Sequence, residues 1–187
     1  MQDHLAAETL ERLQGVRNAA RSDLQAFWFP LVVFGGLTLV SAAVVVLVGP
    51  DALGAYWPVA GPVGGCLTGW YYYRRGHRMG LEGPAAPYVV TAVAILVGAM
   101  LAGALGSQWG SGMTAAVGPT MVVAAGYFVF AWLERSTILV ALAAVLCFLA
   151  LGVTISGMEA EAGTVVLALA SGTASLGIGL ASALRAG

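Results

Sequence analysis

The chain contains six long apolar stretches, and none of them holds an Asp, Glu, Lys, Arg or His residue. Each stretch has about 20 residues, the length that an α-helix needs to cross the hydrocarbon core of a bilayer. Charged residues make up only 9% of the chain, whereas a soluble domain has about 25%. We therefore predict an all-α, polytopic integral membrane protein whose spans pair as three antiparallel hairpins. The predicted spans are Phe27–Val48, Leu53–Tyr73, Pro87–Leu105, Met113–Trp132, Ser136–Ser156 and Gly163–Leu184.

The arginines determine the predicted orientation of these spans. All eight basic residues are arginine, and six crossings place every one of them on the same face of the membrane. The loops on the other face, around Asp51, Gln108 and Glu159, have no basic residue. Because arginine-bearing loops stay in the cytoplasm, we expect both termini there. Arginine without lysine, in a chain rich in Ala and Gly, is typical of a GC-rich bacterial genome, so we expect a multi-pass protein of the bacterial inner (plasma) membrane.

Residues 1–26 are predicted to form a cytoplasmic amphipathic helix, which precedes the transmembrane domain of residues 27–187. Apolar side chains recur in this arm at spacings of three and four, which puts them on one face of a helix. The arm has two interpretations: it lies on the inner leaflet, where its arginines meet anionic lipid headgroups, or it docks a cytosolic protein. Its apolar stripe is Leu13, Val16, Ala20, Leu24 and Phe27, and its arginines are Arg12, Arg17 and Arg21.

The segment from Trp70 to Arg78 changes from aromatic to basic residues. Four consecutive aromatic residues precede Arg74, Arg75 and Arg78. Trp and Tyr prefer the level of the lipid headgroups, so this segment is expected to be the place where the second span leaves the bilayer. Together with the arginines of the arm, these three arginines are the expected cytoplasmic contacts with anionic lipid or with a docking partner.

An internal repeat relates the first two hairpins. Pro30 aligns with Pro87, which lies 57 residues later, and at the same offset Gly61-Pro62 aligns with Gly118-Pro119. Matches of this kind indicate duplication of a structural unit. Both copies start on the same side of the membrane, so the repeat is parallel rather than inverted. The fifth and sixth spans lack the Gly-Pro pair, which leaves open whether they are a third copy.

The two Gly-Pro pairs lie inside their predicted helices, where a proline removes a backbone hydrogen bond and kinks the helix. In one interpretation the kinks only shape helix packing. In the other they separate the second and fourth spans and open a vestibule toward the outside, because irregular backbone is tolerated in a membrane where it lines a cavity. The residues of this vestibule would be Gly61, Pro62, Thr114, Gly118, Pro119 and Thr120, with Tyr56 and Gln108 nearby.

Small residues repeat every four positions along two spans, and such faces let membrane helices approach closely. One face, on the second span, comprises Gly61, Gly65 and Gly69; the other, on the sixth span, comprises Ser171, Ser175, Gly179 and Ala183. Packing within the chain is one interpretation of these faces. A contact between copies in a homo-oligomer, made through the sixth span, is the other.

The lack of ionisable residues in the spans limits the possible functions. Membrane enzymes and ion-coupled transporters usually place ionisable groups within their spans. Because these spans have none, we expect neither proton-coupled transport nor an enzyme. The two cysteines and two histidines lack metal-ligand or cofactor spacing, and a net charge of −1 does not favour nucleic acid. Two hypotheses remain: a non-catalytic accessory or regulatory partner of another protein, and a passive pore or facilitator for a small neutral solute, lined by the kinked second and fourth spans.

Overall fold

A computed structural model of the chain describes residues 28–79, 86–109 and 112–186. Within these ranges the protein is all-helical, with six long α-helices, one short 3-10 helix and no strand. The predicted cytoplasmic arm, residues 1–26, lies outside the described residues. The helices are α2 (Trp28–Val48), η1 (Pro50–Ala52), α3 (Leu53–Met79), α4 (Ala86–Trp109), α5 (Gly112–Glu134), α6 (Thr137–Ser156) and α7 (Ala160–Ala186).

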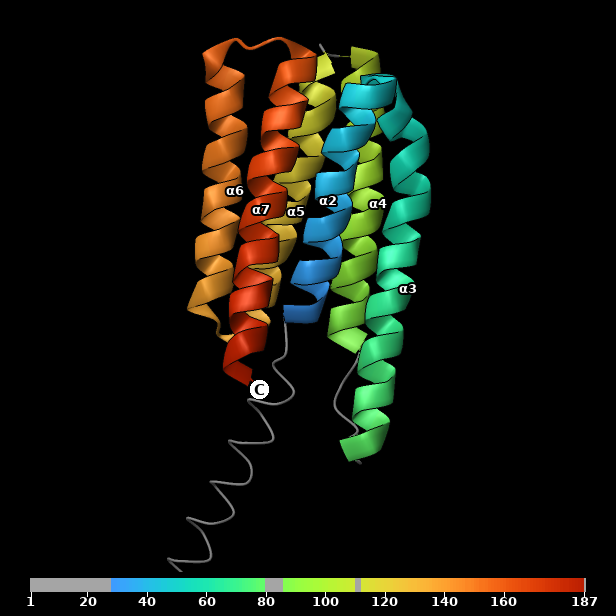
Figure 1. Ribbon diagram of the computed structural model, residues 1–187, viewed down its shortest axis with the longest axis vertical. Helices are drawn as coiled ribbons and strands as arrows, with labels where there is room; N and C mark the ends of the chain where they lie inside the picture. Colours follow the sequence, from blue (N-terminus) through green and yellow to red (C-terminus); the bar gives the residue numbers. More distant parts are fainter. Residues whose placement is uncertain (1–27, 80–85, 110–111, 187) are drawn as a thin grey trace, which may run out of the picture.

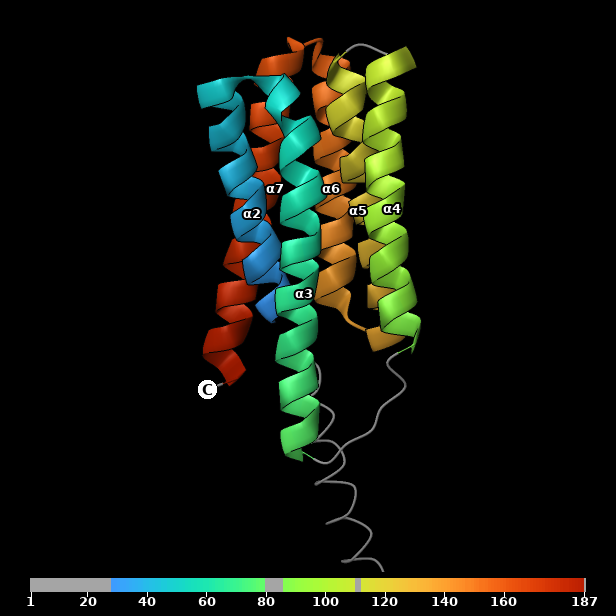
Figure 2. The same ribbon diagram turned by 90° about the vertical axis from the view of Figure 1, so that its right-hand side faces the viewer.

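Five of the six long helices are long and apolar enough to cross a membrane: α2, α4, α5, α6 and α7. The membrane character expected from the sequence is therefore present. The exception is α3, which has 27 residues but whose glycines, prolines and aromatic residues lower its mean hydropathy. α3 also continues to Met79, beyond the predicted end of the span at Tyr73, and it extends past the other helices (Figures 1 and 2).

The helices run side by side as one bundle, in which α2 and α7 make the most extensive pair. The next most extensive contacts are those of α5 with its two chain neighbours, α4 and α6. The contact of α3 with α2 is smaller, and its contact with α4 is smaller still, so α3 lies at the edge of the bundle. We name the end of the bundle where α2 begins and α7 ends the arginine end, because Arg74 and Arg135 lie there.

Two clusters of buried apolar side chains centre on α6 and join it to α2, α5 and α7. The cluster nearer the arginine end centres on Leu139 and Leu142 of α6 with Leu31 of α2 and Ala131 of α5. The other cluster, toward the opposite end, is Ala150, Val153 and Leu167. In the described residues α3 contributes only Ala60 to the buried apolar core, and α4 contributes none. Most large apolar side chains of α3 and α4 are exposed at the surface of the isolated chain, as suits helices that face lipid tails.

The turn between α5 and α6 has a non-glycine residue in the left-handed region. Arg135 has φ 54°, and the next residue, Ser136, donates its backbone N–H to the carbonyl of Ala131 at 3.0 Å. At the C-terminus of α6 the corresponding position is a glycine, Gly157, with φ 64°. An L-residue in this region costs about 1–2 kcal/mol relative to its preferred conformation. The exposed Arg135 therefore carries a conformational cost that Gly157 avoids.

Candidate functional site

The Gly-Pro pair of α3 meets α4. A Cβ atom on Gly61 would lie 2.9 Å from Cδ1 of Leu96, so a side chain at this position would displace the leucine. Pro62, the next residue, is exposed. α3 remains helical through Pro58 and Pro62, and Figure 1 shows its upper turns curving toward α2. The glycine of this pair thus packs between helices, while the proline faces outward.

The Gly-Pro pair of α5 meets the same helix. A Cβ atom on Gly118 would lie 3.3 Å from the carbonyl oxygen and from the Cβ of Ala102 in α4. Pro119 is half-buried, and α5 also remains helical through it. Leu96 and Ala102 are about 9 Å apart along α4, at a rise of about 1.5 Å per residue. The structure therefore brings both Gly-Pro glycines against α4, at two different depths.

Two of the other residues expected near a vestibule, Thr120 and Tyr56, donate hydrogen bonds to helix backbone. Thr120 donates its hydroxyl to the carbonyl of Ala116, one turn earlier in α5, at 3.0 Å. Tyr56 of α3 donates to the carbonyl of Leu37 in α2 at 2.7 Å. Gln108 is exposed at the end of α4, and the side chain of Thr114 lies outside the described part of the chain. Tyr56 thereby links the edge helix to its neighbour.

The two hairpins of the sequence repeat pack differently. In the second hairpin a Cβ atom on Gly126 would collide with the side chain of Ile95, so α5 lies tightly against α4 there. Gly69 is the repeat counterpart of Gly126, and no atom lies within 4 Å of its Cβ position. Gly65, on the same face of α3, is likewise open. The glycine face that holds a neighbour in α5 is therefore turned outward in α3.

The small-residue face of α7 is largely used inside the chain. A Cβ atom on Gly179 would lie 2.9 Å from Cγ2 of Val32 in α2. Ser175 is 5% exposed, and its hydroxyl is hydrogen-bonded to Tyr127 of α5. Ser171 and Ala183 are half-buried. This placement fits the interpretation that the face packs within the chain.

A close backbone contact between α2 and α7 was not predicted from the sequence. A Cβ atom on Gly35 of α2 would lie 2.7 Å from the backbone nitrogen of Leu176 and 3.1 Å from the carbonyl oxygen of Gly172, both in α7. Gly172 in turn packs against the side chain of Leu39. Gly172 is adjacent to Ser171, which belongs to the predicted small-residue face of α7. A contact between the first and last helices leaves no pattern within either helix alone.

Most hydroxyl groups of the bundle donate to their own helix. Eight serine and threonine side chains of the described residues bond a carbonyl three or four residues earlier: Thr38, Ser41, Thr120, Thr154, Ser156, Thr164, Ser171 and Thr173. Thr68 differs, because its Oγ1 is buried and has no hydrogen-bond partner. It lies on α3 between Gly64, which packs against Phe34 of α2, and Tyr71, which stacks on Phe29. Thr68 therefore leaves a buried hydroxyl without a hydrogen bond where α3 packs on α2.

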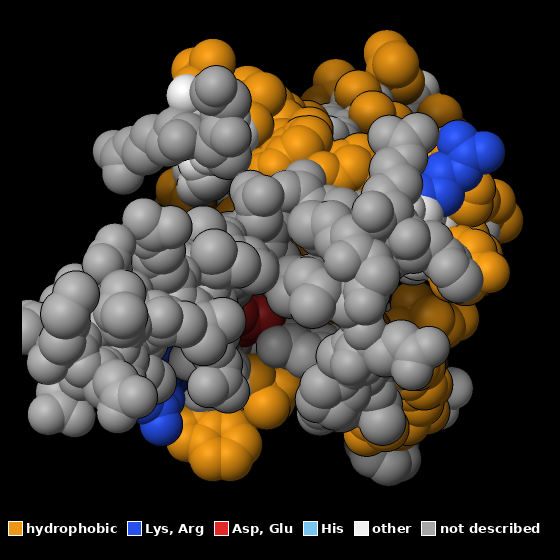
Figure 3. Space-filling view, turned by 90° about the horizontal axis from the view of Figure 1, so that it is seen from below, with side chains coloured by type: hydrophobic (Ala, Val, Ile, Leu, Met, Phe, Trp, Pro, Cys, Tyr) orange, Lys and Arg blue, Asp and Glu red, His pale blue; other side chains and the backbone are white. Residues whose placement is uncertain are grey.

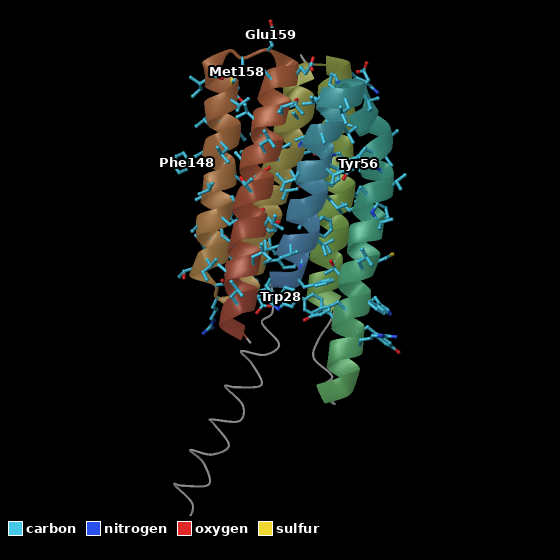
Figure 4. The ribbon with its side chains drawn as sticks, viewed as in Figure 1. Trp28, Tyr56, Phe148, Met158 and Glu159 are labelled. Atoms are coloured by element: carbon cyan, nitrogen blue, oxygen red, sulfur yellow. The ribbon has the colours of Figure 1, made fainter. Side chains whose placement is uncertain are left out.

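A cluster of aromatic rings joins α2 to α3 at the arginine end. The rings of Phe29 and Tyr71 are stacked, with centroids 4.1 Å apart and an interplanar angle of 11°. Trp28, which Figure 4 shows at the start of α2, meets Tyr71 edge-on at 5.7 Å. Aromatic rings of this kind gather where a span meets the headgroup layer. α3 passes this level and continues for two more turns.

Arg74 of α3 lies just beyond this cluster. Its guanidinium carbon is 4.3 Å from the centroid of the Trp70 ring, within the range of a cation–π contact. Figure 3 shows the arginine end, where the described arginine side chains form two separate blue areas among hydrophobic groups. The other expected contact arginines cannot be placed with Arg74: Arg75 and Arg78 belong to α3 with side chains outside the described part, and Arg12, Arg17 and Arg21 fall outside the described residues altogether.

Comparison of the chain with protein-family models, with curated proteins and with solved structures finds no match.

Proposed function

We propose that all six long helices span the membrane as three antiparallel hairpins, with the arginine end and both termini in the cytoplasm. The distribution of arginines supports this orientation, because Arg74 and Arg135 lie at the end where α2 begins. α3 joins the five strongly apolar helices as the sixth span, since it runs alongside α2 and is exposed at Val59 and Val63. The matched positions of Pro62 and Pro119 inside α3 and α5 support a parallel repeat of the first two hairpins.

In this account the protein is a non-catalytic accessory or regulatory partner of another membrane protein. The observation that carries the proposal is the position of α3 at the edge of the bundle, where the predicted small-residue face is packed at Gly61 and open at Gly65 and Gly69. Gly61 and Gly64 meet α4 and α2, while Gly65 and Gly69 have no atom within 4 Å of their Cβ positions. Open small-residue faces are the surfaces through which membrane helices associate.

The contacts of the Gly-Pro pairs favour this role over that of a facilitator. A vestibule between the second and fourth spans needs both pairs to face a common opening. Instead, Gly61 and Gly118 pack against α4, and Pro62 faces outward. Thr120, expected near the opening, donates a hydrogen bond to the carbonyl of Ala116. These groups are occupied by packing and by local hydrogen bonds, so they are poorly suited to replace the hydration of a passing solute.

A photo-crosslinking experiment tests the partner surface. Cys66, next to Gly65, is exposed, so the Cys147→Ala variant carries one native thiol at the border of the open face of α3, to which a thiol-reactive benzophenone can be attached. The matched control carries its only cysteine at Phe148 of α6, which is 74% exposed and points away from the bundle (Figure 4). Illumination in the native membrane is expected to yield an adduct with one different protein from Cys66 and only lipid adducts from position 148.

Three other outcomes contradict the accessory role. Equal adducts from both positions mean that the open face of α3 is ordinary lipid-facing surface. An adduct with a second copy of the chain replaces the accessory role with a homo-oligomer. If purified protein conducts a neutral solute across liposomes, and Pro62→Ala and Pro119→Ala both change that flux while deletion of residues 1–24 does not, the chain is a facilitator.

A further inference from the structure

We infer that Arg74 and Trp70 of α3 form a discrete binding site for the headgroup of one anionic phospholipid of the inner leaflet. The inference goes beyond the proposed function: it uses the membrane orientation but not the accessory role. Its starting point is the cation–π contact, in which the Arg74 guanidinium lies 4.3 Å from the centre of the Trp70 ring.

The contact with the Trp70 ring orients the Arg74 guanidinium and leaves its N–H groups free to donate hydrogen bonds. An arginine over an aromatic ring uses the flat face of the guanidinium, so the N–H groups at its edge can still bind phosphate oxygens in a bidentate manner. Arg74 is exposed, and no carboxylate of the described residues forms an ion pair with it. A charged group that is already oriented loses less conformational freedom on binding than a freely moving arginine does. The Arg74–Trp70 pair is thus preorganised to bind an anion.

The depth of the pair selects a lipid as the source of that anion. Tyr71, adjacent to Trp70, stacks on Phe29 and meets Trp28 edge-on, and these two residues begin α2. Trp70 therefore lies at the level where the spans end, and Arg74 lies about 6 Å farther along the helix axis. Lipid phosphates occupy this layer beside the aromatic belt.

An apolar strip leads from the pair into the bilayer. Val63, Leu67, Trp70 and Arg74 are spaced by four, three and four residues, which places them on one face of α3. Val63 is 49%, Leu67 46% and Trp70 55% exposed. An acyl chain can lie along this strip while its headgroup binds Arg74. Gly65 and Gly69, proposed above as the surface for a partner helix, point to a different side of α3, so both surfaces can be occupied together.

The test measures phospholipid retained by the purified full-length protein in native mass spectrometry, with phosphatidylglycerol and phosphatidylcholine offered in equal amounts. Wild-type protein is expected to retain one phosphatidylglycerol in preference to phosphatidylcholine. In the Arg74→Gln variant the ratio of bound phosphatidylglycerol to bound phosphatidylcholine is expected to fall about fivefold, which is the effect of one arginine at a charged membrane surface. Trp70→Leu keeps the charge of Arg74 but removes the ring, and it is expected to lower this ratio by a similar factor.

Arg135→Gln is the matched control, because Arg135 is an exposed arginine at the same end of the bundle and has no cation–π contact among those the structure describes. It is expected to change the preference by less than about twofold. The site is overturned if Arg74→Gln and Arg135→Gln have equal effects, if Trp70→Leu has none, or if the wild type shows no preference. Competition by millimolar inorganic phosphate also overturns it, because the site then binds free anions rather than lipid. Thermal unfolding of each variant identifies any that has lost its fold, and Arg74→Lys then replaces Arg74→Gln.

Discussion

Gly35 of α2 lies so close to Leu176 of α7 that a Cβ atom on the glycine would be 2.7 Å from the leucine backbone nitrogen. Backbone atoms cannot move aside as the end of a flexible side chain can, so an added methyl group must separate the two helices. We expect Gly35→Ala to lower the free energy of unfolding by about 1–3 kcal/mol, the usual cost of overpacking, in SDS titrations of the protein in mixed micelles.

The adjacent glycine provides the control for this substitution. Gly36 has no atom within 4 Å of its Cβ position and lies in the same helix. Gly36→Ala should therefore leave the stability unchanged or raise it by up to about 1 kcal/mol, the difference in helix propensity between the two residues. Equal losses at both positions would mean that α2 and α7 do not pack as described.

A second pair of glycines tests whether the two hairpins pack differently. Gly126→Ala should destabilise the protein by about 1–3 kcal/mol, because its new methyl group meets the side chain of Ile95, whereas Gly69→Ala should be neutral or slightly stabilising. The same unfolding assay measures both variants. If instead Gly69→Ala is the more harmful, α3 packs on α2 as α5 packs on α4, and its glycine face is closed.

Removal of the hydroxyl of Thr68 is expected to stabilise the protein, because this hydroxyl has no hydrogen-bond partner. A buried polar group without a hydrogen bond costs about 1–3 kcal/mol, and valine has nearly the shape of threonine without the hydroxyl. Thr68→Val should therefore raise the thermal unfolding temperature. Thr164→Val is the control, because Thr164 is 8% exposed and donates to the carbonyl of Ala160 at 2.7 Å. A stability loss in Thr68→Val would show that the hydroxyl has a partner in the membrane.

The left-handed conformation of Arg135 can be tested with two substitutions that remove the same charge. Glycine adopts positive φ without strain, so Arg135→Gly should stabilise the turn between α5 and α6 by about 1 kcal/mol. Arg135→Ala keeps the strain and should give no such gain. Equal unfolding temperatures for the two variants would contradict the φ of 54°.

The sequence predicts the helices well, because a span is encoded locally. The predicted span Ser136–Ser156 agrees with α6 at both ends within one residue, since polar residues and glycine bound the apolar run. α3 continues as a helix beyond the predicted end of the span at Tyr73. The change from Tyr73 to Arg74 marks where a span leaves the bilayer, and a helix need not stop there: arginine is a good helix former.

Which helices contact one another was harder to predict from the sequence. Adjacent spans in the chain were expected to pair as hairpins, yet the most extensive contact joins α2 to α7, through Gly35 and Gly172. The face of a helix on which a glycine lies can be read from its spacing, but the helix that this face meets depends on the whole bundle. For this reason the sequence leaves both packing and a vestibule open for Gly61, and its contact with Leu96 is found only in the structure.

If the open face of α3 binds a different protein, native mass spectrometry of the protein gently extracted from its own membrane will detect that partner. We expect a complex with a second protein in fixed stoichiometry, which Gly65→Leu and Gly69→Leu each disrupt without lowering the yield of folded chain. A closed assembly of this chain alone, unaffected by both substitutions, would rule out the accessory role.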